Sequence, residues 1–203
     1  MAISKDDRER IAAAIRAAEE KTAGEIVCVL ARRSTGSAAL PILLAAIVAL
    51  AVPWILVEAT ALTVHRVLAL QVLTFVVLVG LVCIPAIRIA LIPRATRRAA
   101  AHRSAMEQFH IRRIARTEDR CGVLIFVSLE ERYARVVVDD GIAARVPQSH
   151  WQEAIDALVA HMRDGRIADG FIAAIDSCGK ELAAHFPRQA DSRDELPDRI
   201  FLI

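Results

Sequence analysis

Four acidic residues lie at the ends of short apolar runs in this 203-residue chain: Glu25, Asp119, Asp139 and Asp140. We expect the three runs to be strands, the first two parallel and the third antiparallel to the second. In that arrangement the start of the first strand lies beside the end of the third. Clustered carboxylates suit a hard cation such as calcium or magnesium. The alternative interpretation, which stays open, is that these residues only form turns and solvated strand ends.

A second polar group follows the second strand and consists of Ser128, Glu130, Glu131 and Arg132. In α/β proteins ligands often bind beyond the carboxyl ends of parallel strands, where this group is expected. A simple turn between two strands explains the same residues. The sequence contains no GxSxG, P-loop or HExxH motif and no paired Cys/His spacing, so it identifies no catalytic residue and no cofactor-binding motif.

The elements that position these groups alternate between helix and strand. An amphipathic helix follows Ser4, which has the chemistry of an N-cap, and strands are expected at residues 25–31, 121–128 and 133–139. Two more helices follow, the first with Ser149 as its expected cap, and the last residues, 200–203, dock on the domain or on a membrane. The pattern predicts an α/β fold, a small mixed sheet with helices on both faces.

Two uncharged apolar runs, residues 38–57 and 67–87, interrupt this domain. Each is long enough to cross a bilayer as a helix, which predicts a transmembrane hairpin at residues 38–93. Residues 1–37 then form the first helix and strand of the domain, and residues 94–203 form its remainder with a charged tail. Arg and Lys flank the two spans, so the positive-inside rule places both termini in the cytoplasm, at the inner membrane.

Five arginines and no acid occur between residues 88 and 103. We interpret them as the topology signal and as contacts to anionic headgroups, so the lipid bilayer is an expected partner. Nucleic acid is not, because the net charge is only +2 and aromatic residues do not alternate with the basic ones. The linker after the first strand spans about 25 Å at most. The edge carrying residues 128–132 is therefore expected to face the membrane, and the acidic edge the cytoplasm.

Several segments together resemble the TPM domain family. They are TEDRCGVLIFVS at residues 117–128, VVVDDGI at 136–142, EEKTAGE at 19–25, the helix around Trp151, Asp164-Gly165, GFIAAI at 170–175 and DELP at 194–197. The resemblance covers residues 11–33 and 105–187 and makes the hairpin an insertion after the first strand. It implies a small α/β fold with helices on both faces of the sheet.

Members of that family are described as phosphatase-like, as calcium-binding, or as assisting membrane complexes. The resemblance therefore implies either an accessory module for other membrane proteins or a divalent-metal-dependent phosphatase. The sequence departs from the family after the third strand, where a glycine-rich segment followed by an acid is replaced by DDGIAAR at residues 139–145. We expect the accessory role, with the phosphatase as the alternative and enzymatic activity undecided.

Overall fold

The structure is a computed structural model that describes residues 3–34, 39–84, 87, 92–114, 120–188 and 196–203. The chain forms two compact units. The first combines Met1–Ser34 with Arg98–Ile203, and the second is Thr35–Arg97. The domain that holds the candidate sites is thus assembled from chain on both sides of the second unit.

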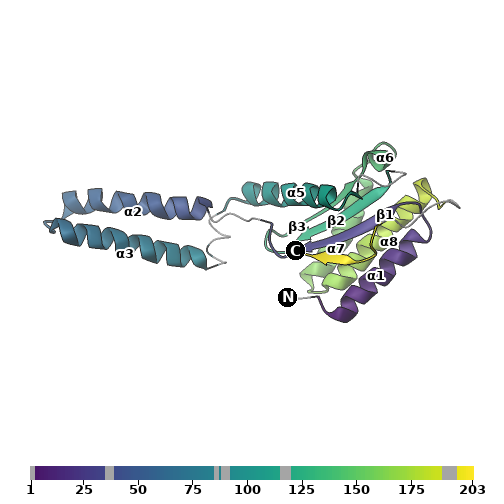
Figure 1. Cartoon of the computed structure of the whole chain (residues 1–203), viewed down its shortest axis with the longest axis horizontal. Coiled ribbons are helices and arrows are strands. Elements are labelled where there is room, and N and C mark those ends of the chain that lie inside the picture. Colours follow the sequence, from purple (N-terminus) through teal and green to yellow (C-terminus); the bar gives the residue numbers. More distant parts are fainter. Residues whose placement is uncertain (1–2, 35–38, 85–86, 88–91, 115–119, 189–195) are drawn as a thin grey trace. The chain divides into compact units, whose positions relative to one another are not determined.

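A four-stranded mixed sheet, in the order β3-β2-β1-β4, forms the centre of the first unit (Figure 1). Its strands are β1 (Glu25–Ala31), β2 (Gly122–Ser128), β3 (Tyr133–Val138) and β4 (Ile200–Leu202). β1 runs parallel to both β2 and β4, whereas β3 is antiparallel to β2. The predicted hairpin of the second and third strands is confirmed, and the last residues dock on the domain as an edge strand.

Helices cover both faces of this sheet, as predicted. α1 (Lys5–Glu19), α7 (His150–Arg163) and α8 (Ile167–His185) pack on one face, around a core that includes Trp151 and Phe171. α5 (Arg94–Ile111) contributes Ala105 and Phe109 to the smaller core on the other face. β1 and β2 are buried at every position because both of their faces are covered.

The N-terminal cap predicted from the sequence is present at α1, whereas the one predicted at α7 differs in the structure. The Ser4 hydroxyl accepts the Asp7 N–H at 3.0 Å and donates to the Asp7 carboxylate at 2.8 Å, which satisfies the start of α1. Ser149 occupies the N-cap position of α7 as predicted, but the predicted capping box is wrong, because this residue has helical backbone angles and its side chain makes no capping bond. The segment after β3, expected to be a turn, forms the short helix α6 (Asp140–Ala143), which Asp139 caps.

The second unit contains two long apolar helices, α2 (Ala39–Ala59) and α3 (Val64–Cys83), which pack against each other. Small side chains at Ala45 and Ala49 of α2 and branched ones at Val67 and Val82 of α3 are buried. Most other apolar side chains are exposed; Trp54, for example, has 80% of its surface accessible. Both helices are long and apolar enough to cross a membrane.

Candidate functional site

The acidic edge of the sheet brings together two of the four predicted carboxylates. Glu25 pairs with Gly122 at the start of the parallel strands, and the Asp139 N–H donates to the Gly122 carbonyl at 3.0 Å. Both acidic side chains are buried, at 6% and 5% exposure. Asp140 is exposed on α6, and Asp119 lies outside the described residues. The strand register thus places Glu25 and Asp139 on either side of one glycine.

The oxygens of these two carboxylates differ in their partners. Glu25 Oε2 accepts the Leu196 N–H at 3.2 Å, so the segment that leads into β4 closes over it. Asp139 Oδ1 accepts the Asp140 N–H at 2.7 Å, whereas its Oδ2 is buried and has no hydrogen-bond partner in the described part of the chain. A buried carboxylate oxygen without a partner is rare, since its desolvation is uncompensated.

A third carboxyl at this edge, Glu19, was not predicted from the sequence. Its Oε1 accepts the Ile26 N–H at 2.7 Å, which ties the end of α1 to the start of β1. Burial raises the pKa of Glu19 to about 9, with Glu25 and Asp198 adding to the shift. The carboxyl is therefore protonated at neutral pH. Its position was visible in principle, because Glu19 continues the four-residue repeat of buried Ile11 and Ile15.

At the acidic edge, Glu25 and Asp139 offer carboxylate oxygens as ligands, and Glu19 holds a proton. Across the described residues, no three His, Cys, Asp or Glu side chains gather in a group that could hold a metal ion. The carboxylates of Glu25 and Asp139 together carry about four oxygens, fewer than the roughly six to eight oxygen ligands that calcium takes. The predicted metal site therefore stays a prediction that also involves Asp119.

The opposite edge holds a hydrogen-bonded cluster of Ser34, Ser128 and Glu131. The Ser34 N–H donates to Glu131 Oε2 at 3.0 Å, and its hydroxyl donates to Ser128 Oγ at 2.9 Å. Ser128 in turn donates a short hydrogen bond to Glu131. Ser128 and Glu131 are buried, at 1% and 8% exposure. This cluster fixes the last residue of the first unit before the chain enters the second one.

A cavity of about 540 Å³ opens beside this cluster, between the start of β3 and the end of α7. Ser128 and Arg132 line it from the turn after β2, and Met162 and Arg163 line it from α7. Arg132 has a positive φ of 49°, a left-handed conformation that residues with a Cβ seldom adopt. Of the second predicted group, Ser128 and Arg132 reach the cavity, whereas Glu131 is engaged by the two serines.

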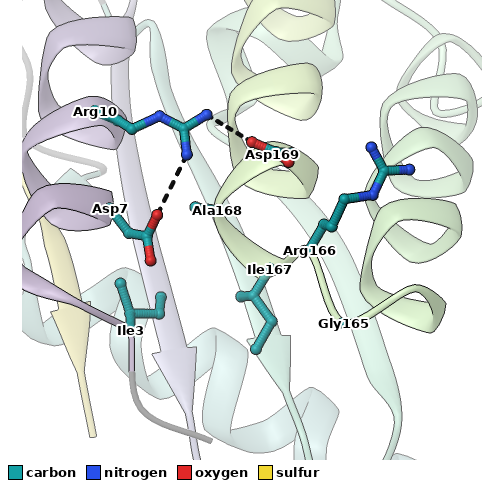
Figure 2. A pocket seen from close by; sticks show the side chains of 8 residues that line it. All are labelled: Ile3, Asp7, Arg10, Gly165, Arg166, Ile167, Ala168 and Asp169. Atoms are coloured by element: carbon teal, nitrogen blue, oxygen red, sulfur yellow. Dashed lines mark hydrogen bonds and ion pairs between the residues drawn. The ribbon is translucent and has the colours of Figure 1, made fainter.

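A second hollow of about 240 Å³ lies between the first turns of α1 and α8 (Figure 2). Figure 2 shows Arg10 reaching from α1 toward α8, where it donates to Asp169 at 2.6 Å, and it also donates to Asp7 at 3.3 Å. The bond to Asp169 raises the pKa of Arg10, and the bond from Ser4 lowers the pKa of Asp7. The charges in this hollow are mutually neutralised, so we interpret it as a structural link between two helices.

Comparison with known proteins identifies the family. The model of the TPM domain matches residues 85–181, which include α5, β2, β3, α7 and most of α8. This match assigns residues 85–181 to the TPM domain family. The solved NMR structure of BA42 protein from the psychrophilic bacterium Bizionia argentinensis is similar, with a TM-score of 0.64 and 21% identity over 100% of this chain and 96% of that chain.

This likeness to BA42 supports the fold of the TPM domain. A search of functionally curated proteins finds no significant match to the chain. The family match begins at residue 85, so it excludes α1 and β1, although β1 lies between β2 and β4 in the same sheet. The TPM domain of this protein thus includes chain from both sides of the apolar helices.

Proposed function

We propose that this protein is a membrane-tethered accessory protein whose TPM domain acts on other membrane proteins at the cytoplasmic face of the inner membrane. The observation that supports this proposal is the place of the apolar helices, which interrupt one domain between β1 and α5. A domain joined to its anchor at one end is free to swing on its linker. Here the chain leaves from Ser34 and returns by Arg98, so two connections restrict the domain.

The first connection is short and fixed at its domain end. Ser34 is hydrogen-bonded to Glu131 and Ser128, and residues 35–38 separate it from the first residue of α2. Such a segment spans about 18 Å when fully extended. A domain held this close to its anchor meets partners in the bilayer far more often than soluble ones, because tethering raises the effective concentration.

Photo-crosslinking in cells tests this proposal. A photoreactive amino acid replaces one of two exposed residues. The first is Arg33, which precedes the residue where the chain leaves the TPM domain, and the second is Ser149, which precedes α7 near the acidic edge. We expect reproducible adducts with integral membrane proteins from position 33 and fewer from position 149. Adducts with soluble proteins alone, or none from either position, would contradict the accessory role.

A divalent-metal-dependent phosphatase is the second candidate. It is favoured by Asp139 Oδ2, which is buried and has no hydrogen-bond partner among the described residues, and by Glu25, which lies across Gly122 from Asp139 in the strand register. Calcium titration and hydrolysis of p-nitrophenyl phosphate with the full chain test it, using Asp139→Asn and, as the exposed control, Asp140→Asn. The phosphatase candidate requires Asp139→Asn to lose both signals and Asp140→Asn to keep them. Absence of both signals from the parent protein removes this candidate.

A further inference from the structure

The cavity between β3 and α7 combines an apolar wall with a basic rim. Val127 and Ala134 of the sheet and Val159 and Met162 of α7 form the wall. Arg132 and Arg163 line the same cavity, and both are exposed. Its volume of about 540 Å³ falls within the range of sites that bind small ligands.

In the part of the chain that the structure describes, the two rim guanidiniums have no acidic partner, unlike those of Arg10 and Arg166. Within the described residues neither Arg132 nor Arg163 lies in ion-pair distance of a carboxylate. Asp164 follows Arg163 directly, but it pairs with Arg166 at 3.0 Å. Arg10, in the hollow of Figure 2, is occupied by two carboxylates. Among the described residues, the cavity rim thus carries two guanidiniums that have no ion-pair partner.

The chemistry of an occupant follows from these two features. Arginine pairs match the oxygens of a phosphate group, to which each planar guanidinium can donate two hydrogen bonds. The apolar wall adds a preference for a phosphate that carries hydrocarbon. Tyr133 also lines the cavity, and its hydroxyl suits the polar groups of a headgroup.

We propose that this cavity binds the phosphate headgroup of an anionic phospholipid, with the glycerol and first methylenes against the apolar wall. The proposal rests on the membrane tethering proposed above, which would keep the cavity near a bilayer. Ser128 lines the cavity and its Oγ lies 2.9 Å from Ser34, where the chain leaves for α2. The lipid would thereby orient the TPM domain toward the membrane surface.

The backbone of Arg132 offers a variant that removes its charge without weakening the fold. Glycine adopts a φ of 49° more easily than arginine, so Arg132→Gly deletes the guanidinium while relieving the turn. Arg113 is a matched control, because it is also exposed and has a φ of 56°. Arg113→Gly removes the same charge with the same backbone relief at the end of α5, away from the cavity.

Titration calorimetry of the full chain in a nonionic detergent tests the proposal with dioctanoylphosphatidylglycerol. We expect at least a tenfold rise in Kd for Arg132→Gly and for Arg163→Gln, no change for Arg113→Gly, and weaker binding of dioctanoylphosphatidylcholine. Equal losses in all three variants would overturn the proposal, as would equal binding of the two lipids. Glycerol 3-phosphate or inorganic phosphate binding as tightly as the lipid would also overturn it, because the free phosphate would then be the ligand.

This experiment does not depend on membrane insertion, since the short-chain lipid is presented in micelles. A chain that binds the lipid but fails to insert contradicts only the tethering. A chain that inserts but does not bind contradicts only the lipid site.

Discussion

The Ser34 N–H donates to the Glu131 carboxylate at 3.0 Å, which joins the point where the chain leaves the TPM domain to the turn between β2 and β3. Ser128 is hydrogen-bonded to both residues, so half-buried Ser34 is fixed by buried Ser128 and Glu131 at the point where the chain leaves the domain. The residues are distant in sequence, and the parallel pairing of β1 and β2 places their strand ends side by side. This contact therefore fixes the last residue of the TPM domain before the chain continues to the apolar helices.

Glu131→Ala should loosen the chain exit and destabilise the domain. The substitution leaves the Ser34 N–H and the Ser128 hydroxyl without their acceptor, a loss of about 1–3 kcal/mol in unfolding free energy. Urea unfolding measures this loss, and limited trypsin digestion after Arg33 should become several-fold faster. Glu131→Gln keeps an acceptor oxygen and serves as the control. Equal trypsin rates for the parent and Glu131→Ala would contradict the anchoring role.

Glu19→Gln should stabilise the protein increasingly as the pH rises. The folded-state pKa of Glu19 is about 9, above the ordinary 4.5, so between these values the folded state holds a proton that the unfolded state has lost. Stability then falls with rising pH by up to about 1.4 kcal/mol per pH unit, less with residual solvent access. Below the ordinary pKa both states are protonated and this effect disappears.

The glutamine variant lacks that proton equilibrium but keeps an oxygen for the Ile26 N–H. Thermal unfolding at pH 5, 7 and 8.5 checks the prediction: the variant's advantage in Tm should grow across the series. An advantage that is constant or that shrinks with pH would show that Glu19 is ionised in the folded protein.

Gly122→Ala should damage the acidic edge. A Cβ at this position would lie 2.6 Å from the Ile114 carbonyl oxygen and also collide with the Ile114 side chain, so backbone must move. We expect a loss of about 1–3 kcal/mol in urea unfolding. Gly80→Ala is the control, because a Cβ there meets no atom within 4 Å. Similar stabilities of the two variants would contradict the close packing at the start of β2.

The thiols of Cys28 and Cys178 should resist alkylation in the native protein. Both are fully enclosed, and burial raises the pKa of Cys178 to about 12 and the pKa of Cys28 well above its ordinary value. Since the thiolate is the reactive form, iodoacetamide at pH 8 should modify them only after unfolding. Mass spectrometry of the modified peptides measures this, and native modification at the rate of the unfolded chain would contradict it.

The sequence predicted the mixed sheet and its helices well, because β1 and β2 are continuous apolar runs with clear boundaries. It did not predict pairing of β4, since three residues at the end of a charged tail carry too little periodicity. Ser149 precedes α7 as predicted, but its backbone angles are helical and its hydroxyl makes no capping bond. Local residue types thus predicted where helices and strands occur better than they predicted the interactions at the ends of these elements.

The candidate sites were predictable only in part. Strand polarity was enough to bring Glu25 and Asp139 to one edge, since pairing follows from the order of the strands. The burial of Glu19 was missed because an acidic residue at a helix end is ordinarily solvated. The contacts of Ser34 with Glu131 depend on the exact position of a loop, which neither composition nor spacing encodes.

Cysteine labelling in intact cells tests the central claim, a TPM domain tethered by an inserted membrane hairpin. Ala61 lies between α2 and α3, and Ser149 lies in the domain. A membrane-impermeant maleimide should label Ala61→Cys in intact spheroplasts and Ser149→Cys only after lysis, with the parent protein giving the background. Labelling of Ala61→Cys only after lysis, or release of the protein from membranes by carbonate, would contradict the claim.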